Sequence, residues 1–173
     1  MINSKYQKIY EEFLKNYEQI HVNPWHEIDK QELERIVNDL LQRYDVTGGY
    51  SFCYFMNYIL KRLGGISDAH TIYKPNAPIP INFKIFGEDV LVNYPSDLRG
   101  SKLVSINNVD IRLILKELDE ILTYGTLGKK RVEMERALFN RCLIWGLPSL
   151  KGSEELTFQI LTCDNKLVTK TYE

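Results

Sequence analysis

Apolar residues recur at helical spacing in three segments of the first 64 residues. Residues three and four apart share one face of a helix, so this spacing predicts amphipathic helices. The first helix is expected from about Ser4 to Ile20, before a break at Asn23-Pro24. The second begins after Asp29, which forms a capping pair with Glu32, and the third ends at Gly64-Gly65. None of these helices can bury its apolar face alone, so we expect a three-helix bundle.

The pattern changes after Pro75, where a proline-rich stretch indicates a boundary. Short alternating segments then predict strands, including two joined by a tight turn and a hairpin at the end of the chain. The predicted strands cover residues 83–86, 90–93, 102–108, 156–162 and 166–172. Two apolar sets predict helices, with residues 124–130 as a loop between them: Ile111, Leu115, Leu118 and Leu122, and, on a longer helix, Val132, Met134, Leu138, Cys142 and Leu143. The fold class is therefore α+β, with a helical bundle over 1–74 and a mixed region over 75–173.

Composition narrows the classes of partner. The 173 residues are 44% hydrophobic and 26% charged, which is typical of a globular chain that can bury a core. A net charge of -1, with acids and bases interleaved, gives no basic patch for nucleic acid or an anionic membrane. The chain opens on a charged amphipathic pattern with no apolar signal segment, so a cytoplasmic location is expected.

Cysteine and histidine spacing predicts neither a metal site nor a cofactor. The three cysteines, Cys53, Cys142 and Cys163, are far apart and lack a C-x-x-C partner, which favours reduced thiols. His21 and His26 lie five residues apart, but no acid or cysteine stands at a metal-binding spacing beside them. We therefore interpret both histidines as structural.

The segment Leu63–Thr71 has the residue types that catalysis uses. His70 stands between the acid Asp68 and the hydroxyl of Thr71, just after a helix that ends in glycine. A histidine acts as a general base near neutral pH when a nucleophile and an orienting group flank it. Neither Ser67 nor Ser105 lies in the G-x-S-x-G context of a nucleophile turn, so no partner for His70 is evident. His70 could equally be a structural histidine that caps carbonyl groups.

Three patterns, in this order, resemble the tail-specific (C-terminal processing) serine peptidases, including their tricorn-core-like members. They are Ile20–His26, the D-x-H-T turn formed by 68–71, and the G-x-x-L-x-x-I-N pattern of 100–107 that leads into a strand, turn and helix. The resemblance covers nearly the whole chain. It implies a helical bundle and a PDZ-like or PDZ-replacing region, whereas the family's serine-bearing core finds no match.

The resemblance also implies roles for individual residues. In tricorn-like members the histidine at the position of His70 is the general base for a serine in the later domain, and Asp68 keeps the D-x-H-T pattern. Ala69 departs from the glycine that is frequent there, which puts the geometry of the turn in doubt. In lysine-dependent branches this histidine has no proton-transfer role. Family members are often exported, in contrast to the cytoplasmic expectation above.

Three functions follow as alternatives. The first is a non-catalytic front portion that binds polypeptides or C-terminal peptide tails, or regulates a protease core. The second is a peptidase half whose His70 serves a separately encoded serine-bearing domain. The third is a degenerate interaction scaffold. PDZ-like modules bind peptides by adding a strand to a sheet edge, but the sequence leaves the peptide-binding residues unknown.

Overall fold

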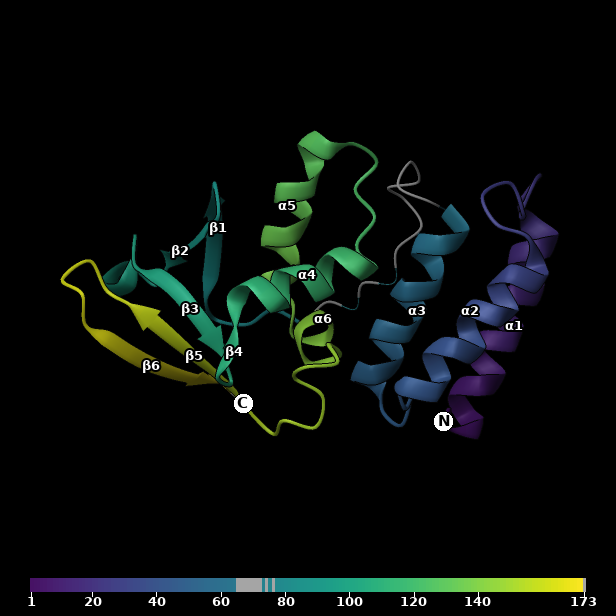
Figure 1. The fold of residues 1–173 in the computed structure, drawn as a ribbon, viewed down its shortest axis with the longest axis horizontal. Coiled ribbons are helices and arrows are strands. Elements are labelled where there is room, and N and C mark those ends of the chain that lie inside the picture. Colours follow the sequence, from purple (N-terminus) through teal and green to yellow (C-terminus); the bar gives the residue numbers. More distant parts are fainter. Residues whose placement is uncertain (65–72, 74, 76, 173) are drawn as a thin grey trace.

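Three helices lie side by side at one end of the computed structural model, which describes residues 1–64, 73, 75 and 77–172 (Figure 1). They are α1 (Ser4–Ile20), α2 (Lys30–Arg43) and α3 (Gly49–Gly64). The Asp29 side chain accepts a hydrogen bond from the backbone N–H of Glu32, as the predicted capping pair requires. Asn3 caps α1 in the same way through the N–H of Lys5.

Helix α3 differs from the amphipathic helix that its sequence predicts, because every residue from Ser51 to Leu60 is buried. One side packs against α1, where the Tyr10 ring meets Phe55 edge-on at 5.2 Å between centroids. The opposite side packs against α4 (Ile111–Ile121) and α6 (Arg141–Trp145) from the second half of the chain. A helix covered on all sides needs apolar residues all round, which explains its high content of aromatic and aliphatic residues.

The other end of the molecule is an antiparallel sheet with strand order β1-β2-β3-β5-β6, and β4 pairs with β3 beside this path. The chain is therefore α+β, as predicted. Between β3 and β4, Asn107 and Asn108 adopt positive φ values of 50° and 63°, which asparagine tolerates in tight hairpin turns. The strands and the short 3₁₀ helix η1 have these bounds: β1 (Asn82–Phe86), β2 (Asp89–Tyr94), η1 (Ser96–Leu98), β3 (Lys102–Ile106), β4 (Val109–Asp110), β5 (Leu156–Leu161) and β6 (Leu167–Tyr172).

Helices α4 (Ile111–Ile121), α5 (Leu127–Leu138) and α6 (Arg141–Trp145) lie between the sheet and α3 (Figure 1). Two sequence expectations are wrong here. Helix α5 begins at Leu127, inside the predicted loop, and the longer predicted helix is divided in two at Asn140. The Asn140 side chain accepts hydrogen bonds from the N–H groups of Cys142 and Leu143, so it starts a new helix instead of continuing the old one.

One hydrophobic core runs from α1 through α3, α4 and α6 to the inner face of the sheet. The boundary between residues 74 and 75 stays a prediction, since apolar packing crosses from α3 to α4 and α6. Within the described ranges, no helix combines the length and the apolar character needed to cross a bilayer.

The cysteines are free thiols, and they should differ in reactivity. Burial raises the pKa of Cys53 from near 9 to about 12, so this thiol stays protonated near pH 8 and reacts slowly. Cys163 is exposed. We expect a thiol reagent to modify Cys163 rapidly in the folded protein and Cys53 only after unfolding, with Cys163→Ser as the control. Rapid native-state labelling of Cys53 in that variant would contradict the packing of α3.

The raised pKa of Cys53 also makes the stability of the folded protein depend on pH. Between about pH 9 and 12 the unfolded chain releases the Cys53 proton that the folded chain retains, so this thiol makes the protein less stable as pH rises.

Candidate functional site

The predicted catalytic residues Asp68 and His70 lie outside the described residues, as do Ser67 and Thr71. The structure does describe both flanks of this segment. Gly64 ends α3 and is buried, and Tyr73 is the next described residue. The roles of Asp68 and His70 therefore stay predictions. The contacts of the described residues on each side show how the chain is held before and after this segment.

The Asn57 side chain binds the backbone of Tyr73, the first described residue after this segment. Asn57 lies in the middle of α3 and is only 1% exposed. Its Nδ2 donates to the Tyr73 carbonyl at 2.6 Å, and its Oδ1 accepts from the Tyr73 N–H at 3.0 Å. Its Nδ2 also donates to the carbonyl of Cys53 at 2.9 Å. A buried amide that satisfies both backbone groups of one residue fixes that residue against the helix.

Asn140 forms a second contact with this part of the chain, at Pro75, two residues after Tyr73. Its Nδ2 donates to the Pro75 carbonyl at 2.8 Å while its Oδ1 caps α6. The backbone continues the attachment, because the N–H of Arg141 donates to the Ala77 carbonyl at 2.7 Å. In the sequence, Asn57 and Asn140 each interrupt a run of apolar residues. That interruption was the available sign of their role, and neither residue is among the sequence-based predictions.

Two basic residues fix the last turn of α3 to the end of α4. Lys61 Nζ donates to the Asp119 carbonyl, and Arg62 Nη1 donates to the Glu120 carbonyl at 3.0 Å. The Arg62 guanidinium also lies 3.2 Å from the centre of the Tyr58 ring. Burial lowers the pKa of Lys61 and of Arg62. Cations at a helix C-terminus are favourable, so this end of α3 is firmly placed.

Among the described residues, no serine hydroxyl is hydrogen-bonded to a histidine. The Ser105 hydroxyl donates to Gln159 and the Ser149 hydroxyl to Glu117, and neither contacts a histidine among the described hydrogen bonds. The His21 ring packs on Tyr17 at 4.1 Å, and His26 Nδ1 lies 2.9 Å from the Asn23 carbonyl. In the described ranges, no three His, Cys, Asp or Glu side chains gather as a metal site.

The predicted strands 83–86, 90–93 and 102–107 are expected to leave at least one sheet edge, and the first of them does, as the edge strand β1. The other two lie inside the sheet, as β2 and β3. The edge strand β1 is covered by α5, because the Ile85 N–H donates to Glu135 Oε1 at 3.0 Å and Lys84 pairs with Glu135 Oε2 at 2.7 Å. A side chain thus occupies a donor that an added peptide strand would use. The other edge is β6, which pairs with β5 alone.

No protein-family model and no curated protein sequence matches the chain. Solved structures of CPAF, a chlamydial serine protease similar to tail-specific proteases, do match its fold. Mature CPAF complexed with lactacystin gives a TM-score of 0.58 at 17% identity, over 97% of this chain and 34% of CPAF. A serine-to-alanine mutant of CPAF gives 0.52 at 18% identity, over 96% and 33%. Mature CPAF gives 0.52 at 17% identity, over 83% and 28%.

This chain therefore spans about a third of the length of the CPAF structures that it matches. At such identity the likeness shows the fold alone: the chain has the fold of one portion of CPAF.

Proposed function

We propose that the chain serves as a non-catalytic front portion of a tail-specific-peptidase-like protein, where it binds polypeptide or regulates access to a protease core. The observation that carries this proposal is the match in fold over 97% of the chain to about a third of CPAF. Among the described side chains, no serine hydroxyl is hydrogen-bonded to a histidine, which is consistent with it.

The test is a peptidase assay of the isolated chain on unstructured peptides. Without an activated hydroxyl and an oxyanion site, we expect no turnover, because loss of the nucleophile removes most of a serine peptidase's rate enhancement, on the order of a millionfold. Turnover that survives repurification and disappears in His70→Ala would contradict the proposal. His26→Ala is the matched control, since His26 is exposed and lies in the loop before α2.

A second candidate function is that His70 supplies the general base to a serine on a separate domain. The observation in its favour is the pair of anchors, Asn57 and Asn140, that fix the chain at Tyr73 and Pro75, just after His70 in the sequence. A base must be held within hydrogen-bond reach of its nucleophile, so rigid mounting is what this role requires.

This candidate is tested by mixing the chain with the serine-bearing core of a CPAF-like protease that lacks the matching portion. Restored hydrolysis that is lost with His70→Ala and kept with His26→Ala would support the base role. Restored hydrolysis that survives His70→Ala would leave only a scaffolding role for the chain.

A further inference from the structure

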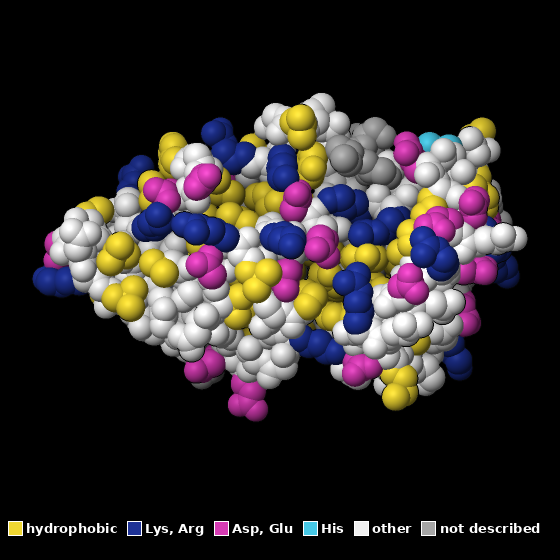
Figure 2. All heavy atoms as spheres, viewed as in Figure 1, with side chains coloured by type: hydrophobic (Ala, Val, Ile, Leu, Met, Phe, Trp, Pro, Cys, Tyr) yellow, Lys and Arg dark blue, Asp and Glu magenta, His cyan; other side chains and the backbone are white. Residues whose placement is uncertain are grey.

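An open cleft of about 520 Å³ lies where the β1–β2 turn, α4 and the start of α5 meet. Its size is in the range of ligand sites, but it is open to solvent instead of enclosed. Figure 2 shows Lys and Arg side chains across this face of the molecule, with hydrophobic side chains exposed between them. The lining residues are Ile85, Gly87, Leu115, Lys116, Asp119, Leu127, Lys130, Arg131 and Met134.

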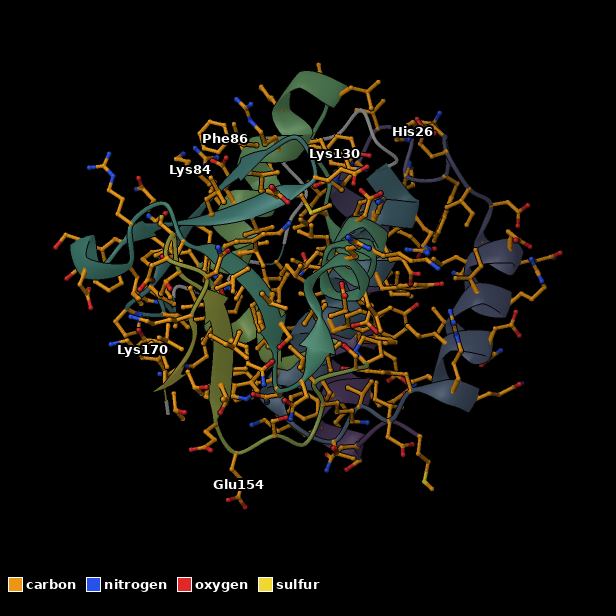
Figure 3. All side chains as sticks on the ribbon, turned by 60° about the vertical axis from the view of Figure 1, so that its left-hand side comes forward. His26, Lys84, Phe86, Lys130, Glu154 and Lys170 are labelled. Atoms are coloured by element: carbon orange, nitrogen blue, oxygen red, sulfur yellow. The ribbon has the colours of Figure 1, made fainter. Side chains whose placement is uncertain are left out.

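The apolar part of the cleft includes a side chain that the described part of the chain leaves largely exposed. Leu127 is the first residue of α5 and is 80% exposed, although it lines the cleft. Phe86, next to Gly87 in the turn, is 61% exposed. Figure 3 places Phe86, Lys84 and Lys130 on the same side of the molecule as this turn. An apolar ligand side chain that covers Leu127 would remove apolar surface from water.

The charged part of the lining has three cations and one acid. The acid, Asp119, is already engaged, since its Oδ2 lies 2.7 Å from Lys130 Nζ. Arg131 lies 3.9 Å from Glu135, whose carboxylate also holds Lys84 and the Ile85 N–H. Lys116 makes no hydrogen bond or ion pair with any residue in the described part of the chain. The cleft therefore presents a surplus of positive charge around an apolar floor.

We propose that this cleft binds an acidic peptide segment that carries an apolar side chain. The proposal rests on the proposed role in handling polypeptides and adds the site and the chemistry of its ligand. The apolar side chain packs on Leu127, Leu115 and Met134, and flanking carboxylates face Lys116, Lys130 and Arg131. Charge complementarity of this kind selects acidic over neutral or basic segments.

The mode of binding differs from strand addition. Because Glu135 of α5 occupies the Ile85 N–H, a peptide at this place is held by its side chains and not by a ladder to β1. A free C-terminal carboxylate is then not required, and an internal acidic segment is an equally good ligand. A long acyl chain, in contrast, needs an enclosed cavity, which this open cleft does not provide.

The probe is a short fluorescent peptide, acetylated and amidated, with a leucine flanked by glutamates. Anisotropy titration at low salt is expected to give saturable binding that weakens as salt rises. Lys116→Glu and Leu127→Ser should each weaken binding about fivefold, consistent with rim charges and exposed apolar contacts worth about 1 kcal/mol. Both residues are largely exposed, so these variants should keep the fold, which thermal unfolding would verify.

The chain offers matched controls away from the cleft. Lys8→Glu changes an exposed lysine on α1, and Leu167→Ser changes a leucine of β6 that is 59% exposed. Both should bind the peptide as the unaltered chain does. A peptide with glutamines in place of glutamates should bind about tenfold more weakly.

Each remaining outcome overturns the site. Equal binding by the glutamine peptide would show that charge does not select the ligand. Equal loss of affinity in the control and cleft variants would show that the peptide does not bind in this cleft. Binding that the cleft variants leave unchanged places the peptide elsewhere, which keeps polypeptide binding and rejects this cleft. If no binding is seen at about millimolar peptide, the dissociation constant is too weak for a functional site and the cleft is rejected. The mixing experiment with a protease core then still tests the proposed function separately.

Discussion

Replacing Phe55 with alanine should lower the free energy of unfolding by about 3–5 kcal/mol, which is enough to unfold a marginal domain. The Phe55 ring is fully buried at the centre of α3. It meets Tyr10 of α1 edge-on at 5.2 Å and stacks near Phe52 at 6.2 Å. The substitution removes these contacts and leaves a cavity between α1 and α3 that the surrounding helices can fill only in part.

Denaturant titration followed by circular dichroism measures this loss. Phe86→Ala is the matched control, because the same atoms are removed from a side chain that is 61% exposed. Surface substitutions usually change stability by about 0.5 kcal/mol or less. A loss below about 1 kcal/mol for Phe55→Ala would mean that α1 and α3 do not share a core.

The sequence predicts best where one local signal decides the structure. The Asp29 cap and the apolar stripe behind it locate α2, and the two-residue turn at Gly87 and Glu88 locates the β1–β2 hairpin. In both places the determining contacts lie within a few residues along the chain. Local propensity and tertiary packing then favour the same answer.

The errors arise where a side chain acts at long range. Asn140 divides α5 from α6 because its amide caps one helix and binds Pro75, 65 residues away. Periodicity alone carries no sign of that contact. The burial of α3 on all sides has the same origin, since α4 and α6 cover it from distant parts of the chain.

The roles that the sequence suggests for Asp68 and His70 stay predictions, because both residues lie outside the described part of the chain. The D-x-H-T pattern singles out this segment, and the structure describes contacts before it, at Lys61 and Arg62, and after it, at Tyr73 and Pro75. The cationic cleft beside α5 could not be foreseen, because its lining comes from β1, α4 and α5, and the sequence analysis treated the start of α5 as a loop. Side chains from separate elements form a site only once the topology is known.

Replacing Asn57 with alanine should cost about 2–4 kcal/mol of stability, and more than its loss of packing volume suggests. Four hydrogen bonds disappear, two of them to the backbone of Tyr73, one to the carbonyl of Cys53 and a longer one to the Cys53 sulfur. A fully buried backbone group left unsatisfied costs about 1–3 kcal/mol, and the N–H and carbonyl of Tyr73, which are part-buried, both lose their Asn57 partner. Asn38→Ala is the matched control, since Asn38 is exposed on α2 and alanine is the better helix former.

Two measurements separate this anchoring role from simple packing. Equilibrium unfolding gives the global loss, and hydrogen exchange at the Tyr73 amide reports the local contact, because that N–H donates to Asn57 Oδ1 in the folded protein. In Asn57→Ala this amide should exchange faster than the global loss of stability requires. Exchange of the Tyr73 amide at the rate of the unaltered chain, or a stability change of less than about 0.5 kcal/mol, would show that Asn57 does not fix the segment after His70. A catalytic base at His70 would then lack the rigid support that the second candidate function requires.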